Sequence, residues 1–327
     1  MSFDLRQLRY FVAVAEERHF GRAALRLSMT QPPLSQQIRA LEESLGAALF
    51  LRTKRSVELT AVGRDLLPEV RRLLAAADGL QPMAQSLARG EVGVLSLAFV
   101  STADYGVLPP LLQRFAERYP GVRLQLTEAT SDVQFDELWA GRIDAGLIIP
   151  PVPARFAPQL DYLPIASEPL VVAMSEAQAE RLGGGPDDAV ALRELAQSPL
   201  IVFPRRLAPA FYDIIMDCFA AARIVPRIGQ EAIQMQTIVS LVSAGMGVAL
   251  VPQSLCNLRR TGVVYRPLLG ALPAVQTGLV WRNAQAGPVL RGFIATARAY
   301  ALERGEHQGD GVPDTADRNS ASRARGV

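Results

Sequence analysis

The apolar residues at the start of the chain recur at the spacing of an α-helix. Leu5, Leu8 and Val12 fall on one face and predict an amphipathic helix over residues 4–17. Ala23 and Leu27 mark a short second helix that follows it. A third apolar stripe, at positions i, i+4, i+7 and i+11, predicts a longer helix whose buried face carries Leu34, Ile38, Leu41 and Leu45.

The third helix is expected to begin at Thr30. Its hydroxyl can accept hydrogen bonds from backbone N–H groups one turn further on. Pro32 and Pro33 are tolerated in this first turn, because N–H groups there have no intrahelical partner to lose. The face opposite the apolar stripe presents short or planar polar side chains near the start of the helix, namely Gln31, Ser35, Gln36 and Arg39.

This polar face has the chemistry that reads a DNA duplex. In helix-turn-helix proteins, the N-terminal end of the recognition helix enters the major groove. A glutamine amide donates and accepts together, which matches N6 and N7 of adenine, and a helix N-terminus favours a nearby phosphate. The first sixty residues therefore predict helices that end in a groove-reading one.

Residues 47–60 alternate in hydrophobicity and predict a two-stranded wing with Arg52, Lys54 and Arg55 at its tip. Long cations on a wing reach phosphates or the minor groove. Residues 1–64 carry ten basic and six acidic side chains in a chain of net charge +2, so a polyanionic partner is indicated for this segment alone. A surface hairpin with solvated charges is the alternative interpretation of the tip.

Several short motifs in this segment resemble the winged helix-turn-helix of LysR-type transcriptional regulators. They are A-A-x-x-L, T-Q-P-x-L-S-x-Q-I-x-x-L-E-x-x-L-G, L-F-x-R and L-T-x-x-G, at the spacings of that family. The resemblance implies base contacts for Gln31, Pro32, Ser35 and Gln36, and DNA-backbone contacts for Thr30, Arg39, Arg52 and Arg55. Many relatives carry arginine at the position of Gln36. The preferred operator bases there are expected to differ, because arginine prefers guanine and glutamine prefers adenine.

Residues 61–89 carry a heptad repeat of apolar positions, made of Leu66, Val70, Leu73, Ala77, Leu80, Ala84 and Leu87. Such a seam is typical of helices that supercoil with a partner helix, and packing on the helix's own domain is the alternative. Pro68 and Pro82 lie inside the repeat and are expected to kink or shorten the helix. By the family resemblance, this linker helix joins the winged helix-turn-helix of residues 1–60, called the head below, to an effector domain. The resemblance also implies that this helix forms a homodimer and that homotetramers are usual.

From Gly90 onward, strands alternate with helices, which predicts parallel β-α-β units. Strands are expected at 92–100, 122–129, 143–150, 168–174, 200–204, 226–232, 246–252 and 276–282, and helices at 107–121, 131–142, 209–223, 234–245 and 288–302. The pattern indicates two lobes around a cleft, with lobe I at 90–163 and 268–302 and lobe II at 164–267. This arrangement resembles the effector domain of the same family, which is similar to periplasmic binding proteins.

Ligands of open α/β sheets bind beyond the carboxyl ends of the strands. Several of these ends carry hydroxyl or amide side chains that, with free backbone N–H groups, suit a carboxylate: Ser101, Thr102, Thr130, Ser131 and Gln234. Phe203 and Pro204 could supply an apolar wall. The resemblance implies effector contacts at Ser101, Thr102, Ser131 and Phe203, with helix capping as the alternative for the hydroxyl residues. The expected effector is a small organic acid, aromatic or dicarboxylic.

Other classes of protein fit the sequence less well. It has no apolar run of about 18 residues and no signal-peptide pattern, so a cytoplasmic protein without a membrane span is expected. Cys218 and Cys256 form no C-x-x-C pair, and the histidines His19 and His307 join no Ser-His-Asp set or metal cluster. We therefore expect no metal, no cofactor and no enzyme activity. Residues 303–327 are polar and glycine-rich and are expected to be disordered.

Together these patterns predict an α/β protein with an N-terminal all-α winged helix-turn-helix at residues 1–60, a linker helix at 61–89 and a two-lobed effector domain at 90–302. The predicted function is regulation of transcription, through binding of double-stranded DNA at a promoter operator under control of a small organic acid. The alternative is a small-molecule binding protein or enzyme whose N-terminal segment only assembles subunits.

Overall fold

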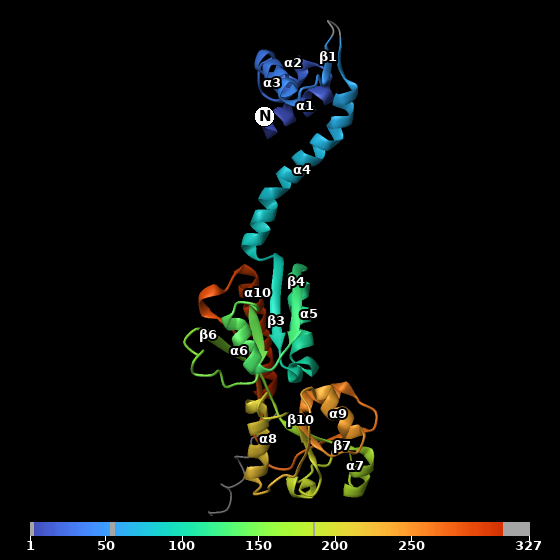
Figure 1. Ribbon diagram of the computed structural model, residues 1–327, viewed down its shortest axis with the longest axis vertical. Helices are drawn as coiled ribbons and strands as arrows, with labels where there is room; N and C mark the ends of the chain where they lie inside the picture. The colour runs from blue at the N-terminus through green and yellow to red at the C-terminus, as the bar shows by residue number, and fades with distance from the viewer. Residues whose placement is uncertain (1–2, 53–55, 186, 310–327) are drawn as a thin grey trace, which may run out of the picture. The chain divides into compact units, whose positions relative to one another are not determined.

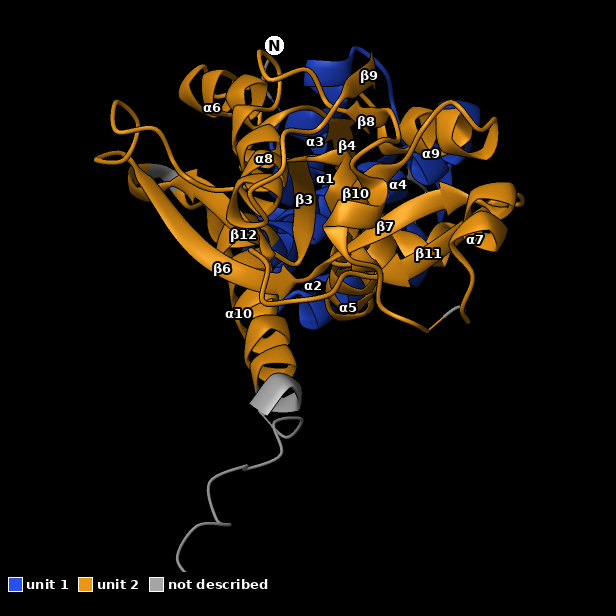
Figure 2. Cartoon of the chain, turned by 90° about the horizontal axis from the view of Figure 1, so that it is seen from below, with its two compact units in different colours: residues 1–86 blue, residues 87–327 orange. Residues whose placement is uncertain are grey.

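The computed structural model describes residues 3–52, 56–185 and 187–309, and the chain divides into two compact units, residues 1–86 and 87–327 (Figure 2). The first unit holds α1 (Leu5–Glu17), α2 (Phe20–Arg26), α3 (Gln31–Leu45), β1 (Phe50–Arg52), β2 (Val57–Leu59) and most of α4 (Ala61–Arg89) (Figure 1). Strands β1 and β2 pair antiparallel, with Phe50 opposite Leu59. The predicted order of helices followed by a two-stranded wing is confirmed.

A single apolar core joins the helices of the first unit. Leu34, Ile38 and Leu41 of α3 are fully buried and pack in the same cluster as Phe11 of α1 and Phe50 of β1. The rings of Phe11 and Phe50 lie 5.5 Å apart, centroid to centroid. Each buried leucine or isoleucine contributes about 1.5–3 kcal/mol, so this cluster holds α3 in one orientation about its own axis.

The helix starts in this unit are capped, with one departure from expectation. His19 caps α2, where its Nδ1 accepts hydrogen bonds from the backbone N–H groups of Gly21 and Arg22 at 3.0 and 3.2 Å. Thr30 is the N-cap residue of α3, but its hydroxyl makes no capping hydrogen bond, so that part of the prediction was wrong. A capping hydroxyl bonds the N–H of the second or third helical residue, and here those residues are Pro32 and Pro33, which have none.

Helix α4 runs from Ala61 to Arg89 without interruption, so of the two expected effects of its prolines, a kink or a shortening, the shortening does not occur. A proline inside a helix costs about 3 kcal/mol, and near Pro68 the burial of Val70 and Leu74 in the core of the first unit offsets this cost. Nothing in the structure explains how the helix tolerates Pro82.

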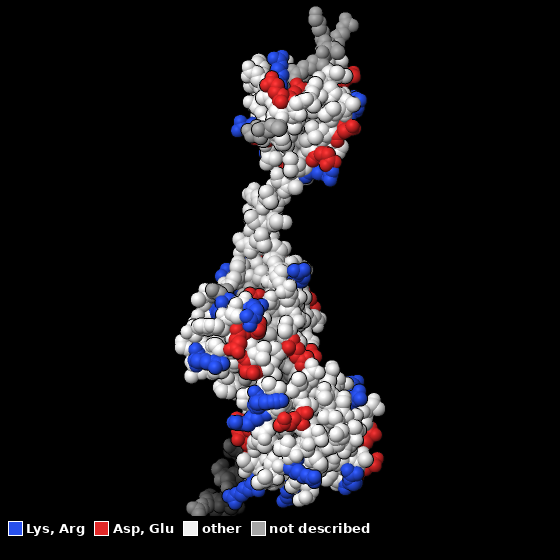
Figure 3. All heavy atoms as spheres, in the orientation of Figure 1, with Lys and Arg blue, Asp and Glu red and all other residues white. Residues whose placement is uncertain are grey.

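The apolar repeat along α4 is largely exposed in the single chain. Leu73, Leu80 and Leu87 have exposed fractions of 47, 64 and 50%. The sequence between Arg72 and Arg89 has Asp78 as its one charged residue, and this stretch of α4 is mostly white, that is, neither acidic nor basic, in the space-filling view (Figure 3). An apolar stripe of this length exposed to water needs a covering surface.

The second unit contains a five-stranded sheet in the order β4–β3–β5–β12–β6. Its strands are β3 (Val92–Phe99), β4 (Gly121–Glu128), β5 (Ala145–Ile148), β6 (Leu160–Glu168) and β12 (Val275–Arg282). Strand β3 is parallel to β4 and β5, and β12 inserts antiparallel between β5 and β6. The predicted return of the chain to this sheet at residues 276–282 is confirmed.

Helices cover both faces of this sheet. α5 (Leu108–Arg118) and α10 (Pro288–Gly309) pack on one face, where Phe115 and Phe293 share a core with Leu97. α6 (Ser131–Trp139) packs on the other face, where Phe135 contacts the cluster around Ala98. Because Leu97 and Ala98 are adjacent in a strand, their side chains point to opposite faces, as this layering requires.

A second sheet follows Pro169. β7 (Leu170–Ser175) lies antiparallel between β10 (Ala249–Pro252) and β11 (Val263–Pro267). β8 (Leu200–Val202) pairs parallel with β9 (Ile228–Glu231), and a bridge between Leu200 and Val248 connects this pair to β10. The helical elements here are α7 (Glu176–Leu182), α8 (Pro209–Ala221), α9 (Met235–Ser243), and the 3-10 turns η2 (Leu192–Leu195) and η3 (Gln253–Leu258); η1 (Ser101–Tyr105) and η4 (Asn283–Gln285) accompany the first sheet.

The elements that the pattern did not predict have recognisable causes. β6 contains Pro164, which is tolerated because β6 is an edge strand, and it carries the first sheet past the expected lobe boundary at residue 163. α7 has no fully buried residue; its contact with the core is made by the partly buried Ala179 and Leu182, too few for a clear apolar stripe. α10 continues beyond Leu302 to Gly309, so residues 303–309 are helical where a disordered tail was expected; residues 310–327 lie outside the described part of the chain. Within the described ranges, no helix is long and apolar enough to cross a membrane.

Glu16, near the end of α1, links two other helices of the first unit. Its carboxylate accepts hydrogen bonds from Arg26 of α2 and Arg71 of α4, both at 2.7 Å. The hydrogen bond from Arg26, followed by that from Arg71, holds the pKa of Glu16 below its usual range. Folding is therefore favoured by the charged form of this carboxyl group.

We predict that Glu16→Gln lowers the free energy of unfolding by up to about 1 kcal/mol at pH 7, since partly exposed ion pairs contribute little. A carboxylate with a lowered folded-state pKa stabilises the protein above its unfolded pKa of about 4.3, and loses this contribution as the pH falls through the folded pKa. Urea unfolding of both proteins should therefore show a difference at pH 7 that shrinks below pH ~4. Glu43→Gln, at an exposed position on α3, is the control. A difference independent of pH would contradict the assignment.

Candidate functional site

The polar residues expected to read DNA share one face at the start of α3. Gln31, Pro32, Gln36 and Arg39 are exposed, as is Thr30, and Ser35 is half-buried. This face lies opposite the buried stripe of Leu34, Ile38 and Leu41. Two predicted contacts are not described: Arg52 ends β1 with its side chain outside the described residues, and Arg55 lies outside them altogether.

Glu42, which is not among the residues predicted from the sequence, fixes the position of the wing relative to α3. Its Oε1 accepts hydrogen bonds from the backbone N–H groups of Leu49 and Phe50, at 2.8 and 3.1 Å. The glutamate of the motif L-E-x-x-L-G was the available signal. One carboxylate thus connects the helix that presents the polar face to the first strand of the wing.

Thr60 makes a second connection, at the start of α4. Its hydroxyl donates to the carbonyl oxygen of Ala48 at 2.8 Å and accepts from the backbone N–H of Gly63 at 2.9 Å. Gly63 approaches the segment before the wing so closely that a Cβ would lie 2.3 Å from the carbonyl oxygen of Leu49. The first turn of α4 is therefore fixed to the residues that lead into β1.

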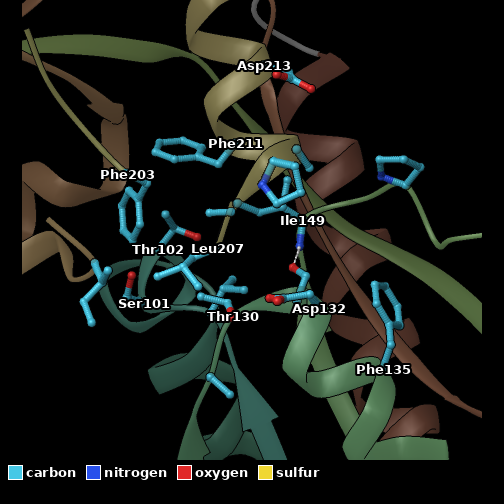
Figure 4. Close-up of a pocket in the computed structure, with 18 of the residues that line it drawn as sticks. Ser101, Thr102, Thr130, Asp132, Phe135, Ile149, Phe203, Leu207, Phe211 and Asp213 are labelled. Atoms are coloured by element: carbon cyan, nitrogen blue, oxygen red, sulfur yellow. Dashed lines mark hydrogen bonds between the residues drawn. The ribbon is translucent and has the colours of Figure 1, made fainter. Parts of the chain in front are cut away.

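The second unit contains a pocket with a volume of about 590 Å³ (Figure 4). Its lining includes η1, the start of α6, the segment after β8, the first turns of α8 and the residue before α9. Of the predicted effector contacts, the structure brings Ser101, Thr102, Ser131, Phe203 and Gln234 together in this lining. Pro204 is buried but does not line the pocket, because adjacent residues of an extended segment face opposite ways and Phe203 faces the pocket.

The hydroxyl groups in the pocket differ in how they are bonded. Ser131 Oγ accepts a hydrogen bond from the backbone N–H of Ile149 at 3.2 Å, which ties the start of α6 to the residue after β5 and is not a helix cap. Thr102 is only 4% exposed, and its Oγ1 has no hydrogen-bond partner among the described residues. A buried hydroxyl without a partner costs about 1–3 kcal/mol, so Thr102 is a polar group in this lining that a ligand could satisfy.

Three helices begin at the pocket. The N-cap residues of α6, α8 and α9 are Thr130, Ala208 and Gln234, and none of them makes a side-chain capping hydrogen bond. The first N–H groups of a helix carry a partial positive charge and lack intrahelical acceptors. The pocket therefore faces helix ends that favour an anionic group.

The charged side chains in the lining are Glu128, Asp132, Asp213 and Arg155. Asp213 accepts two hydrogen bonds from Arg205, at 2.7 and 3.1 Å, and this pairing lowers the pKa of its carboxyl group. Burial, followed by the nearby charge of Asp104, raises the pKa of Glu128. None of these charged residues is among the ligand contacts predicted from the sequence.

Apolar side chains form much of the remaining wall, among them Phe135, Ile149, Leu207, Phe211 and Ile233. The rings of Phe203 and Phe211 meet edge to face at 5.6 Å. In the sequence these residues are indistinguishable from ordinary core positions. The pocket thus combines an apolar wall with a small number of polar groups, as is usual for sites that bind small molecules.

The described residues offer little for catalysis. Burial raises the pKa of the Cys218 thiol to about 11, and it also raises that of Cys256. A thiol with a raised pKa is a poor nucleophile at neutral pH. His19 is engaged as a helix cap, and the described part of the chain has no cluster of His, Cys, Asp and Glu that could hold a metal ion.

Two family models match most of the chain. Residues 5–64 match the model described as "Bacterial regulatory helix-turn-helix protein, lysR family", and residues 88–302 match "LysR substrate binding domain". The chain is 55% identical over 291 residues to the HTH-type transcriptional regulator IlvR of Caulobacter vibrioides, covering 89% of this chain and 96% of that protein. It is 38% identical to AlsR of Bacillus subtilis, covering 89% and 94%.

Solved structures agree with these matches. Full-length CbnR in complex with its target DNA superposes with a TM-score of 0.80 at 32% identity, covering 91% of this chain and all of that one. Full-length BenM gives a TM-score of 0.57 at 29% identity, covering 93% of this chain and 98% of that one. The chain belongs to the LysR family and is a DNA-binding transcriptional regulator.

Proposed function

We propose that the pocket of the second unit binds a small organic acid and that this ligand controls how the protein acts on a promoter operator. The observation that carries the proposal is the buried, unpartnered hydroxyl of Thr102, in a pocket where three uncapped helices begin. A hydroxyl donor and helix N-termini both favour a carboxylate. We further propose that the protein has no enzyme activity, which the raised pKa values of both thiols support.

In the proposed DNA complex, the exposed face of α3 reads base edges in the major groove. Gln31, Ser35 and Gln36 are assigned to bases, together with Pro32, and Thr30 and Arg39 to phosphates. Arg52 and Arg55 are assigned to phosphates from the wing. The similarity to CbnR, a protein solved with its target DNA, supports this assignment.

The exposed seam on α4 is assigned to a homodimer. Leu73, Leu80 and Leu87 repeat every seven residues, so a partner helix can bury all three along one line. Pairing two chains also supplies two copies of α3, which suits an operator with two half-sites. A tetramer would be a pair of such dimers.

Control by the ligand requires that binding of the ligand changes the free energy of binding to DNA. A coupling of about 1–3 kcal/mol is typical of allosteric proteins. By reciprocity, operator DNA changes the affinity for the ligand by the same factor as the ligand changes the affinity for DNA.

We predict that Gln36→Arg changes the preferred base at one operator position from adenine to guanine, because arginine matches O6 and N7 of guanine. The preference should change by roughly 5- to 150-fold, measured by selection of bound sequences from a randomised operator. Arg39→Ala is the comparison, since loss of a phosphate contact should weaken binding to all sequences alike. An unchanged base preference in Gln36→Arg would remove this residue from the reading face.

We predict that Leu80→Glu raises the dimer dissociation constant by at least about 30-fold, since loss of a buried leucine costs about 2 kcal/mol or more. Sedimentation equilibrium at several protein concentrations measures the effect. Gln81→Glu adds the same charge at an exposed position beside the seam and should leave the dimer intact. Equal effects of the two variants would show that α4 does not pair through the seam.

We predict that Thr102→Val raises the free energy of unfolding of the ligand-free protein by about 1 kcal/mol, because it removes a buried hydroxyl without a partner. Thr296→Val is the matched control, because the Thr296 hydroxyl donates to the Gly292 carbonyl oxygen at 3.0 Å. The control should lose about 1 kcal/mol. Chemical denaturation without ligand compares them, and an equal loss in both variants would mean that Thr102 has a structural partner.

A further inference from the structure

The charges that line the pocket do not balance. The charge of Asp213 is neutralised by Arg205, with which it forms a bidentate ion pair. The guanidinium of Arg155 lies over the ring of Phe156, 4.6 Å from its centroid, and 3.8 Å from Asp136. No cation among the described residues pairs with the other two carboxylates of the lining, those of Glu128 and Asp132.

Asp132 is the more constrained of these two. Its Oδ1 is buried and has no hydrogen-bond partner among the described residues. The carboxylate gains some stability from its position in the first turn of α6, where the helix end is positive. A buried lone pair without a donor is still costly, so a ligand that brings a donor to this position gains affinity.

The same pocket lining also contains a set of hydrogen-bond donors. It consists of the hydroxyls of Ser101 and Thr102, the amide of Gln234 and the uncapped start of α9. In the close-up, the side-chain oxygens of Thr102 and Asp132 both face the space that the drawn side chains enclose (Figure 4). The pocket can therefore contact one anionic and one cationic group of the same small molecule.

We infer that the ligand is a zwitterion, an α-amino acid with an apolar side chain. Its ammonium group would bind Asp132, in a lining that also holds Glu128, and its carboxylate would bind the Thr102 hydroxyl and the uncapped helix start. Its apolar side chain would pack on Phe203, Leu207 and Phe211. The inference rests on the proposed function, in which this pocket binds an organic acid, and adds a cationic group to that ligand.

The charge balance distinguishes this class from a dicarboxylate. A second anionic group would approach Glu128 and Asp132, which have no paired cation, and the cation that the described lining offers it is Arg155, already beside Asp136 and Phe156; this disfavours binding. A monocarboxylate without an amino group would leave Asp132 without a donor. An amino acid satisfies both ends.

Calorimetric titration of the full chain with two matched sets of probes tests the inference. The sets are L-leucine, 4-methylpentanoate and 3-methylbutylamine, and L-phenylalanine, 3-phenylpropanoate and 2-phenylethylamine. We expect at least one amino acid to bind about tenfold or more tighter than its analogues that lack the amino or the carboxyl group. Binding of the deaminated acids with equal or higher affinity overturns the inference and leaves the proposed function standing. Absence of binding by all six probes also overturns it, and a failure of carboxylates of every kind would remove the proposed function as well.

Asp132→Asn removes the negative charge and keeps the shape. We expect it to weaken binding of the amino acid about tenfold or more, with no loss of affinity for the deaminated acid. Glu137→Gln makes the same charge change on the same helix, at a residue paired with Arg142 and outside the pocket lining, and should change neither affinity.

Thermal unfolding of each variant without ligand separates binding from folding. If Asp132 served only to stabilise the start of α6, Asp132→Asn would lower the melting temperature and weaken both kinds of probe equally, which would overturn the inference. Should Asp132→Asn fail to fold, Glu128→Gln supplies the test, with a smaller selective loss of amino-acid affinity expected. An equal effect of Glu128→Gln on both kinds of probe would then contradict the assignment.

Discussion

Burial of one face of α3 determines what the head of this protein can present to a partner. Leu34, Ile38 and Leu41 are fully enclosed by the core that also holds Phe11 and Phe50, so α3 cannot turn about its axis without exposing them. The amide and hydroxyl side chains that follow Thr30 are consequently held outward. Glu42 then fixes the wing to this same helix through two backbone N–H groups. The polar face and the wing are thus positioned by packing before any DNA is present.

The head could be predicted closely from its sequence because its burial follows the helical repeat. Where local chemistry competed with a general rule, the rule failed: Thr30 caps α3 by position only, since the residues that would donate to its hydroxyl are prolines. In the second unit, β6 was missed because its Pro164 argues against a strand, although an edge strand tolerates it, and α7 was missed because none of its residues is fully buried. A repeat of apolar residues arises where one face of an element is well buried, so an element with few fully buried residues cannot be predicted from such a repeat.

The residues that line the pocket could likewise be predicted from the sequence only in part. Polar residues at strand ends, such as Thr102 and Gln234, could be selected because parallel strands bring their carboxyl ends together. Asp132 and Phe211 could not, since a carboxylate in a first helical turn and a ring in an amphipathic helix have ordinary local explanations. Their role depends on which segments meet across the fold. Pro204 was selected but lies outside the pocket lining for a related reason. Side chains alternate in direction along an extended segment, so once Phe203 faces the pocket, Pro204 faces away from it.

The bonds of Thr60 have a mechanical consequence. Its single hydroxyl holds both the carbonyl of Ala48 and the N–H of Gly63, and the missing side chain of Gly63 allows the two backbones to touch. The root of α4 and the base of the wing therefore form one stiff joint with no flexible spacer. A rotation of α4 about its own axis would therefore move the base of the wing with it.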